Sequence, residues 1–406
     1  MDSRLYWIWL QQALPYGSNA VGDLLDTFGH ARTIYEALPE EIGKSGLKEE
    51  LCRRLSDKSL DTARRILDRV LELGDWVLTP EDALYPLCLR HMTGCPAALY
   101  ARGTMPDLDT TPAVAVVGTR RASRDGWREA HALAAGLAAG GMVVVSGGAV
   151  GIDAAAHSGA LAAGGVTIVV MACPLNENYP ADNANLRQQV VEQGGLLLSE
   201  FPPDEPYKCE FSVRNRLMVG LSQAVCLAET PSRSGARITA RLAREQDREV
   251  FALPGALSGR LHDGAHKEIQ RGATLVIRAT DILREYAPLY PGMLDLEQAE
   301  TVQQQVEGRK TAPPEPKKKE KSRRKRDKKP KAEPVTAVET LAGTPCPDTA
   351  SPVAKQVYAV LTDRFVPVDE LAAAAGVPIP TLLAALTELE MYGCAQNGAG
   401  QQYKRN

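Results

Sequence analysis

The middle of the chain alternates short apolar runs with helical patterns. The apolar runs, each predicted to be a strand, cover residues 113–117, 142–146, 167–172, 196–199, 224–228, 249–253 and 274–277. Helical patterns separate them at 125–139, 153–163, 183–193, 213–221 and 236–246, and the first three end at paired glycines. Because these strands do not alternate polar with apolar residues, they are typical of a parallel sheet covered on both faces. The pattern predicts an α/β fold with a doubly wound Rossmann-like sheet over residues 111–288.

The N-terminal part, residues 1–72, has apolar residues at three- and four-residue spacing, interrupted by glycines. This predicts a small helical domain (helix-hairpin-helix-like or SAM-like). A DNA-binding helix-hairpin-helix is an alternative, but the short hairpin with its glycine pair and basic flank is missing, which favours a packing or docking role. Residues 73–110 are expected to bridge this domain to the sheet, with a short strand at 76–78.

The C-terminal part has two different regions. Residues 289–350 lose periodicity and include many prolines, so we expect a disordered basic linker. Within it, residues 309–331 hold 13 Lys and Arg; a nonspecific polyanion tether and a plain solvated linker remain equal alternatives. From 351 to 406 the pattern predicts helices at 352–361, 368–375 and 381–391 and a closing hairpin, which together indicate a winged helix.

Charge and cysteine content limit the function classes. Of the net charge of −3, the basic run contributes +10 and leaves −13 for the rest, so any anion site in the folded part must be a local patch. The eight cysteines never form Cys-x-x-Cys, which indicates scattered reduced thiols and no zinc framework. No apolar run approaches membrane-span length. We therefore expect a cytoplasmic protein with no membrane partner, metal or cofactor.

The expected carboxyl ends of the strands gather cations, hydroxyl residues and helix N-termini, which is the chemistry of phosphate binding. Several dispersed cations fit a chain of phosphates, and Phe211 adds a stacking face of the kind that binds single strands; the alternative is that Phe211 packs under its own helix. The candidate DNA-binding residues are Gly118, Thr119, Arg120, Ser146, Gly147, Lys208, Phe211, Arg214, Asn215, Arg216, Ser234 and Gly235.

Nucleotide-enzyme motifs are absent from the sequence. There is no Gly-x-x-x-x-Gly-Lys-Ser/Thr, and the first turn is Gly118-Thr119-Arg120, not Gly-x-Gly-x-x-Gly. Asp153 and His157 could share a metal, but no third ligand has matching spacing, which favours a helix cap and a buried hydrogen-bonding histidine. Glu200 and Glu229 are candidate general bases, yet no nucleophile accompanies them.

Several of these stretches, taken in order, resemble the DNA-processing protein A (DprA, Smf) family. They are Val116–Arg120, Ser146–Asp153 with His157, Tyr179-Pro180, Phe211-Ser212-Val213-Arg214-Asn215-Arg216, Ser234-Gly235 and Pro254-Gly255. The resemblance implies a non-enzymatic single-stranded DNA-binding protein of natural transformation that protects incoming DNA and loads the RecA recombinase. It also implies a homodimer through the Rossmann-like domain.

The sequence departs from the family pattern at a few positions. Val150 stands where many members have arginine, Cys173-Pro174-Leu175 replaces a glycine turn, and His266 and Glu268 lie near the segment the family uses for self-association. The alternative function, a phosphoribohydrolase, would need a Pro-Gly-Gly-x-Gly-Thr turn, but residues 230–235 read Thr-Pro-Ser-Arg-Ser-Gly. A nuclease would need a carboxylate cluster, and the sequence shows none.

The winged helix has an acidic third helix. Its expected recognition helix contains Glu388 and Glu390 and no Lys or Arg. Such a helix does not enter a major groove readily. We therefore predict that this module binds protein or its own chain.

Overall fold

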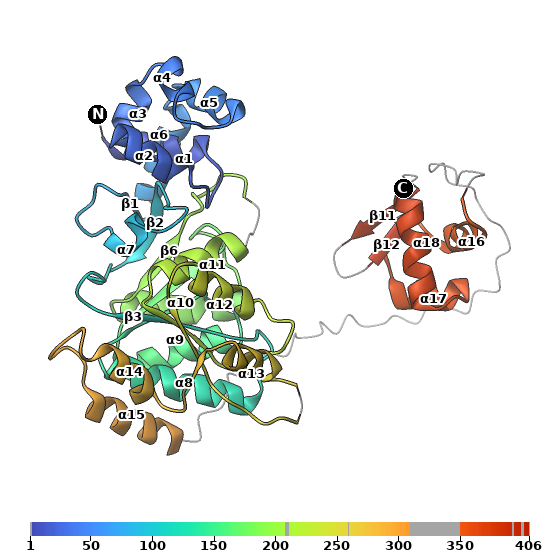
Figure 1. Ribbon diagram of the computed structural model, residues 1–406. Coiled ribbons are helices and arrows are strands. Elements are labelled where there is room, and N and C mark those ends of the chain that lie inside the picture. The colour runs from blue at the N-terminus through green and yellow to red at the C-terminus, as the bar shows by residue number, and fades with distance from the viewer. Residues whose placement is uncertain are drawn as a thin grey trace, which may run out of the picture. The chain divides into compact units, whose positions relative to one another are not determined.

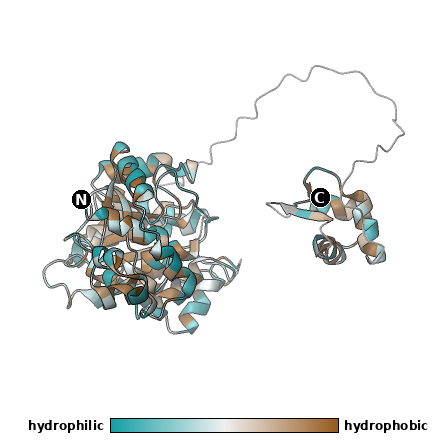
Figure 2. Cartoon of the chain, turned by 90° about the horizontal axis from the view of Figure 1, so that it is seen from above, coloured by the Kyte–Doolittle hydropathy of each residue, from teal (hydrophilic) through white to brown (hydrophobic). Residues whose placement is uncertain are grey.

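The computed structural model describes residues 2–207, 211–258, 260–308, 350–391, 394–398 and 402–405. It contains two compact units, divided after Glu320. The first holds a helical N-terminal module and a sheet covered by helices, and the second is a small α/β unit (Figure 1). Helices in both carry apolar and polar faces, as helices with one buried side do (Figure 2).

The sheet has nine strands in the order β1-β2-β6-β5-β4-β3-β7-β8-β9. The strands are β1 (Trp76–Leu78), β2 (Leu99–Gly103), β3 (Ala113–Val117), β4 (Val143–Ser146), β5 (Thr167–Met171), β6 (Leu196–Ser199), β7 (Ala224–Leu227), β8 (Glu249–Ala252) and β9 (Thr274–Leu275). From β6 to β9 all pairs are parallel, and the doubly wound prediction is confirmed. However, β2 pairs antiparallel with β6 and β1 with β2, so the expected bridge is part of the sheet.

The parallel strands are apolar throughout because both of their faces are covered. In β3, Val114 and Val116 join the core beneath α8 (Arg124–Ala139) and α9 (Ile152–Ala162). The alternate residues Ala113, Ala115 and Val117 join the opposite core. That second core lies beneath α11 (Phe211–Gly220), α12 (Ala236–Glu245) and α13 (Asp263–Gln270). Beside β5 and β6 lies α10 (Ala184–Glu192).

The N-terminal module comprises six helices and packs directly on the sheet. Its helices are α1 (Arg4–Ala13), α2 (Ala20–Phe28), α3 (Ala31–Glu36), α4 (Pro39–Gly43), α5 (Glu49–Ser56) and α6 (Asp61–Glu72). Trp7, Ile8 and Leu10 of α1 share one hydrophobic cluster with Val169 of β5 and Leu197 of β6. This sharing agrees with the packing role that the sequence favours.

The expectation of a linker from residue 289 is wrong for Leu296–Gly308. This stretch forms α15, which packs on α8 and α14 (Ala279–Tyr286). Ala299, Gln303 and Val306 form its buried side. Residues 309–349, which include the basic run, lie outside the described residues.

The second unit has its own core. Helices α16 (Pro352–Val360), α17 (Val368–Ala375) and α18 (Ile379–Met391) pack with a three-stranded sheet ordered β10-β12-β11, formed by Val366–Pro367, Gln402–Arg405 and Ala395–Gly398. Leu371, Leu386 and Leu389 are fully enclosed in that core. This is the helix and strand order that a winged helix requires.

Candidate nucleic-acid interface

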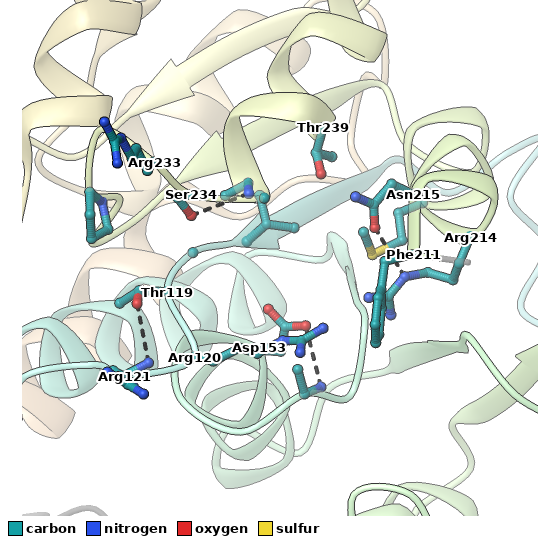
Figure 3. Close-up of a pocket in the computed structure, with 17 residues that line it drawn as sticks. Thr119, Arg120, Arg121, Asp153, Phe211, Arg214, Asn215, Arg233, Ser234 and Thr239 are labelled. Atoms are coloured by element: carbon teal, nitrogen blue, oxygen red, sulfur yellow. Dashed lines mark hydrogen bonds between the residues drawn. The ribbon is translucent and has the colours of Figure 1, made fainter. Parts of the chain in front are cut away.

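A pocket of about 390 Å³ opens beyond the carboxyl ends of β3 and β7. These neighbouring strands are the point where the strand order reverses, because β4 to β6 lie on one side of β3 and β7 to β9 on the other. Ligands of open α/β sheets bind in the crevice at such a switch point. In Figure 3, Phe211 of α11 faces Arg233 and Ser234 across the pocket, with Asp153 of α9 below.

The β3–α8 turn forms one wall of the pocket. The Thr119 amide donates to the Glu229 carbonyl at 2.9 Å, and the Thr119 carbonyl accepts from the Ile152 amide at 3.1 Å. Gly118 must lack a side chain because a Cβ there would lie 2.6 Å from the Ile152 side chain. This packing turns Arg120 and Arg121 outward, and both are exposed at the pocket edge.

Phe211 presents a half-buried ring to the pocket. The guanidinium carbon of Arg120 lies 4.2 Å from its ring centroid, and that of Arg214 lies 6.0 Å away. The ring therefore lines the cation-rich cavity, which favours the stacking role over packing under its own helix. In this arrangement Arg120 shares the aromatic face, so the pocket presents a guanidinium group and a phenylalanine ring together.

Arg214 is buried and fixes the pocket wall. Its Nη1 donates to the carbonyls of Gly147 at 2.5 Å and Val170 at 2.6 Å, and its Nε donates to the Asn215 side chain at 3.1 Å. A Cβ on Gly147 would overlap the guanidinium. Arg214 thus ties α11 to the ends of β4 and β5 while adding positive charge to the cavity.

The far wall is the start of α12. Arg233 is exposed, and the Ser234 hydroxyl accepts from the Ala236 amide at 3.3 Å. Gly235 is exposed, and a Cβ there would meet nothing within 4 Å. The helix N-terminus and the nearby cation give this wall the character of a phosphate site.

Asp153 is the one carboxylate among the residues that line this pocket. Its Oδ2 accepts from the Ala149 amide at 3.3 Å, in the turn before the helix. The expected helix cap is wrong, because Asp153 lies inside α9, whose N-cap is Gly151. Burial raises the pKa of this carboxyl, and the nearby Arg214 opposes that rise. His157 is wholly buried, where Nδ1 bonds the Thr167 hydroxyl at 2.8 Å, and burial lowers its pKa to about 3. No group of three potential metal ligands occurs among the described residues.

The two candidate general bases, Glu229 and Glu200, make hydrogen bonds that join separate elements of the fold. Glu229 accepts from the Ser123 amide at 2.9 Å and from the Ser123 hydroxyl, and that hydroxyl caps α8 at the Gly126 amide. Glu200 accepts two hydrogen bonds from Arg216 at 2.5 and 2.6 Å. Burial raises the pKa of the Glu200 carboxyl against the effect of Arg216. Neither glutamate lines the pocket.

The structure brings eight of the twelve expected DNA-binding residues to the pocket: Gly118, Thr119, Arg120, Phe211, Arg214, Asn215, Ser234 and Gly235. Gly147 lies behind Arg214, and Ser146 is buried with its hydroxyl donating to the Val116 carbonyl. Arg216 turns away to Glu200, and Lys208 lies outside the described residues.

The pocket also contains residues that the candidate set omits. Arg121, Arg233 and Thr239 line it, as do Asp153 and Met218. Arg121 and Arg233 are adjacent in sequence to Arg120 and Ser234. Their position after predicted strands is the sequence feature that could have identified them. Met218 follows Asn215 by one helical turn on α11, a spacing that places both on the same side.

Fold and pocket together define an open α/β protein with a cationic crevice at its switch point. A family model described as DNA recombination-mediator protein A matches residues 76–287, and one described as the DprA winged helix domain matches residues 342–401. The chain belongs to the DNA recombination-mediator protein A (DprA/Smf) family, and the winged-helix prediction is confirmed.

Two relatives and one solved structure illustrate the extent of the similarity. DNA processing protein DprA of Streptococcus pneumoniae is 42% identical over 206 residues, which cover 50% of this chain and 72% of that protein. Protein Smf of Synechocystis is 28% identical over 421 residues and matches 100% of this chain and 99% of its own length. The X-ray structure of DprA from Streptococcus pneumoniae aligns with a TM-score of 0.61 at 33% identity, covering 70% of this chain and 99% of that one.

Proposed function

We propose that this protein binds single-stranded DNA in the pocket beyond β3 and β7. The observation that carries the proposal is the contact between Arg120 and the Phe211 ring in an open, cationic crevice. Phosphates would meet Arg120, Arg233 and the start of α12, while a base stacks on the ring. Family membership supports a role in DNA recombination, with the bound strand passed on to RecA in the cytoplasm and no chemical step on the DNA.

The test compares single- and double-stranded oligonucleotides by fluorescence anisotropy over a range of salt. Phe211→Ala should weaken single-strand binding by about 1–3 kcal/mol and leave the salt dependence unchanged. Arg120→Ala should weaken binding and lower the slope of log K against log salt by about 0.7, the value for one lost single-strand phosphate contact.

Arg128→Ala is the matched control. Arg128 lies on α8, outside the pocket, and pairs with Asp125 at 3.7 Å. Its removal takes away the same charge and should change single-strand affinity far less than Arg120→Ala. Unchanged affinity in both Phe211→Ala and Arg120→Ala would contradict the proposal.

We also propose a homodimer through the β9 side of the sheet. Exposed apolar side chains gather on α12, the β8–α13 loop and β9 with its following turn: Ile238, Leu257, Leu261, Leu275 and Ile277. Edge strands with exposed apolar neighbours favour pairing with another chain. Leu275→Glu with Ile277→Glu should shift the mass measured by light scattering from dimer to monomer; an unchanged mass would refute this interface.

His266 and Glu268, which depart from the family pattern near this surface, both make contacts within the chain itself. Glu268 is buried and pairs with Arg237, Arg244 and Arg271 at 2.8–3.1 Å. Burial by itself raises the pKa of its carboxyl, but Arg237 and Arg244 together outweigh burial, so the pKa lies below its ordinary value. His266 Nε2 accepts from the Gly255 amide at 3.3 Å. We therefore expect the apolar side chains, and not these two, to form the dimer contact.

A further inference from the structure

The loop that leads from β6 toward α11 is held by the N-terminal module. This segment, Glu200–Tyr207, is named here the approach loop; Lys208–Glu210, which follow it, lie outside the described residues. Two arginines of α6 reach it: Arg65 pairs with Glu205 at 2.5 Å and Arg69 with Asp204 at 2.6 Å. The loop ends four residues before Phe211 in the sequence.

Aromatic packing joins the same two parts. The Tyr16 ring, from the turn between α1 and α2, lies 4.9 Å from the Phe201 ring, which lies 5.9 Å from that of Tyr207. Burial raises the pKa of Tyr16 to about 12, which is consistent with a ring enclosed between the module and the loop. The approach loop therefore contacts the module at Phe201, Asp204 and Glu205.

A buried polar network connects the start of the loop to α11. Gln11 of α1 donates to the Glu200 carbonyl at 3.1 Å and to the Ala98 carbonyl at 2.5 Å. The Glu200 carboxylate pairs with Arg216 of α11. Gly17 lies so close that a Cβ there would be 2.8 Å from Arg216 Nε.

Two sides of helix α11 thus contact different parts of the protein. Arg214 and Arg216 are two residues apart, which places them about 200° apart around the helix axis. Arg214 borders the pocket, and Arg216 faces Glu200 and the N-terminal module. The module therefore contacts both the loop before Phe211 and the opposite side of the helix that carries Phe211.

We propose that the N-terminal module is a positioning element of the DNA pocket, and that Arg65 and Arg69 act as positioning residues through the approach loop. This inference rests on the proposed function. It assigns the module no DNA contact of its own. Because the module holds the loop in place in the DNA-free protein, DNA binding has to order less of the chain, and the entropic cost of binding is smaller.

The test is a charge reversal on α6, Arg65→Glu with Arg69→Glu. The matched control is Arg53→Glu with Arg64→Glu, which changes the net charge by the same amount. Arg64 pairs within its own helix with Asp61, and Arg53 makes no ion pair among the described residues. Two readouts are compared: the Kd for a single-stranded oligonucleotide and amide hydrogen exchange of residues 200–207 in the DNA-free protein.

The reversal should weaken binding between about twofold and about 30-fold relative to the control, the range for two exposed ion pairs. It should also speed exchange over residues 200–207, and its salt slope should equal the control's because no phosphate contact is lost. For the rescue, Glu205→Arg is added to Arg65→Glu alone, and this swap should restore the pair, the affinity and the slow exchange that Arg65→Glu loses. Asp204 is left unchanged because its φ of 59° disfavours arginine.

The two proposals fail differently. If wild-type protein binds no single-stranded DNA, the proposed function falls, and the positioning role with it. If wild type binds while the reversal and control variants have equal Kd values, or if exchange over residues 200–207 does not change, the positioning role alone is overturned.

Discussion

At Gly147 the missing side chain makes room for the Arg214 guanidinium. A Cβ at that position would overlap the guanidinium, which bonds the Gly147 and Val170 carbonyls. Gly147, which follows β4, thus leaves space for the Arg214 side chain from α11, a helix far away in the sequence. In sequence it looks like a generic phosphate turn, and in the structure it positions the helix that carries the aromatic platform.

The first prediction compares two glycines of this site. Gly147→Ala should destabilise the protein by about 1–3 kcal/mol, because the Arg214 side chain must shift and its hydrogen bonds weaken. Gly235→Ala should change stability by less than about 0.5 kcal/mol, because a Cβ there meets open space and its φ is negative. Urea unfolding monitored by tryptophan fluorescence measures both; equal effects would show that Arg214 adapts freely.

At the scale of elements, α15 shows where an apolar pattern is too weak to predict a helix. Its buried side uses Ala299, Gln303 and Val306, a small, a polar and a medium-sized residue, within a glutamine-rich stretch. Gln303 is nevertheless buried and joins α15 to α14. Its Oε1 accepts from the Ala279 amide at the start of α14 at 2.8 Å.

The second prediction concerns this glutamine. Gln303→Ala should lower the free energy of unfolding by about 1–3 kcal/mol, because the buried Ala279 amide loses its acceptor. Gln304→Ala is the neighbouring control: its side chain is exposed and bonds Glu300 on its own helix, so about 0–0.5 kcal/mol is expected. Similar values for the two would mean that water replaces the Gln303 contact.

The third prediction concerns the winged helix. The exposed positions of α18 include Thr381, Ala384 and Thr387, none of which is cationic, and Glu388 is engaged with the Ser351 amide at 2.7 Å. Because residues 351–406 contain four Lys and Arg against five Asp and Glu, we expect no measurable binding of this fragment to duplex DNA at moderate salt. Its separate core supports independent folding. Saturable duplex binding in an anisotropy titration would contradict this.

At the scale of the whole molecule, burial of a titratable group couples stability to pH. His157 has a folded pKa of about 3, below its ordinary value of 6.5. Below pH 6.5 the unfolded chain takes up a proton that the folded protein refuses, so stability falls as pH decreases toward 3. The buried carboxyls of Asp153 and Glu200, with raised pKa values, act in the opposite direction as pH rises above about 4.

The fourth prediction isolates the histidine. His157→Gln should reduce the acid sensitivity of the unfolding free energy between pH 6 and 4 by about 1.4 kcal/mol per pH unit at most. Above pH 7 the variant should be no more stable than wild type. Parallel stability curves from pH 7 to pH 4 would show that His157 accepts a proton in the folded protein.

The helices that the structure describes include none with the length and apolar character needed to span a membrane.

Local sequence determined most of the elements. Continuous apolar runs such as that of β3 must be covered on both faces, and the helical patterns between them require a parallel sheet. The positions of Gly118, Arg120 and Ser234 at strand ends follow from that arrangement. Eight of the pocket residues could be anticipated because parallel strands deliver their carboxyl ends to one edge of a sheet.

Contacts between distant segments decided the rest. Arg214 and Arg216 are the same residue type two positions apart, and only the tertiary structure turns one to the pocket and the other to Glu200. The antiparallel β2 and the buried side of α15 likewise depend on partners far away in the chain. Sequence patterns report which residues avoid water, whereas the partner of each buried polar group is chosen by the packing of the whole fold.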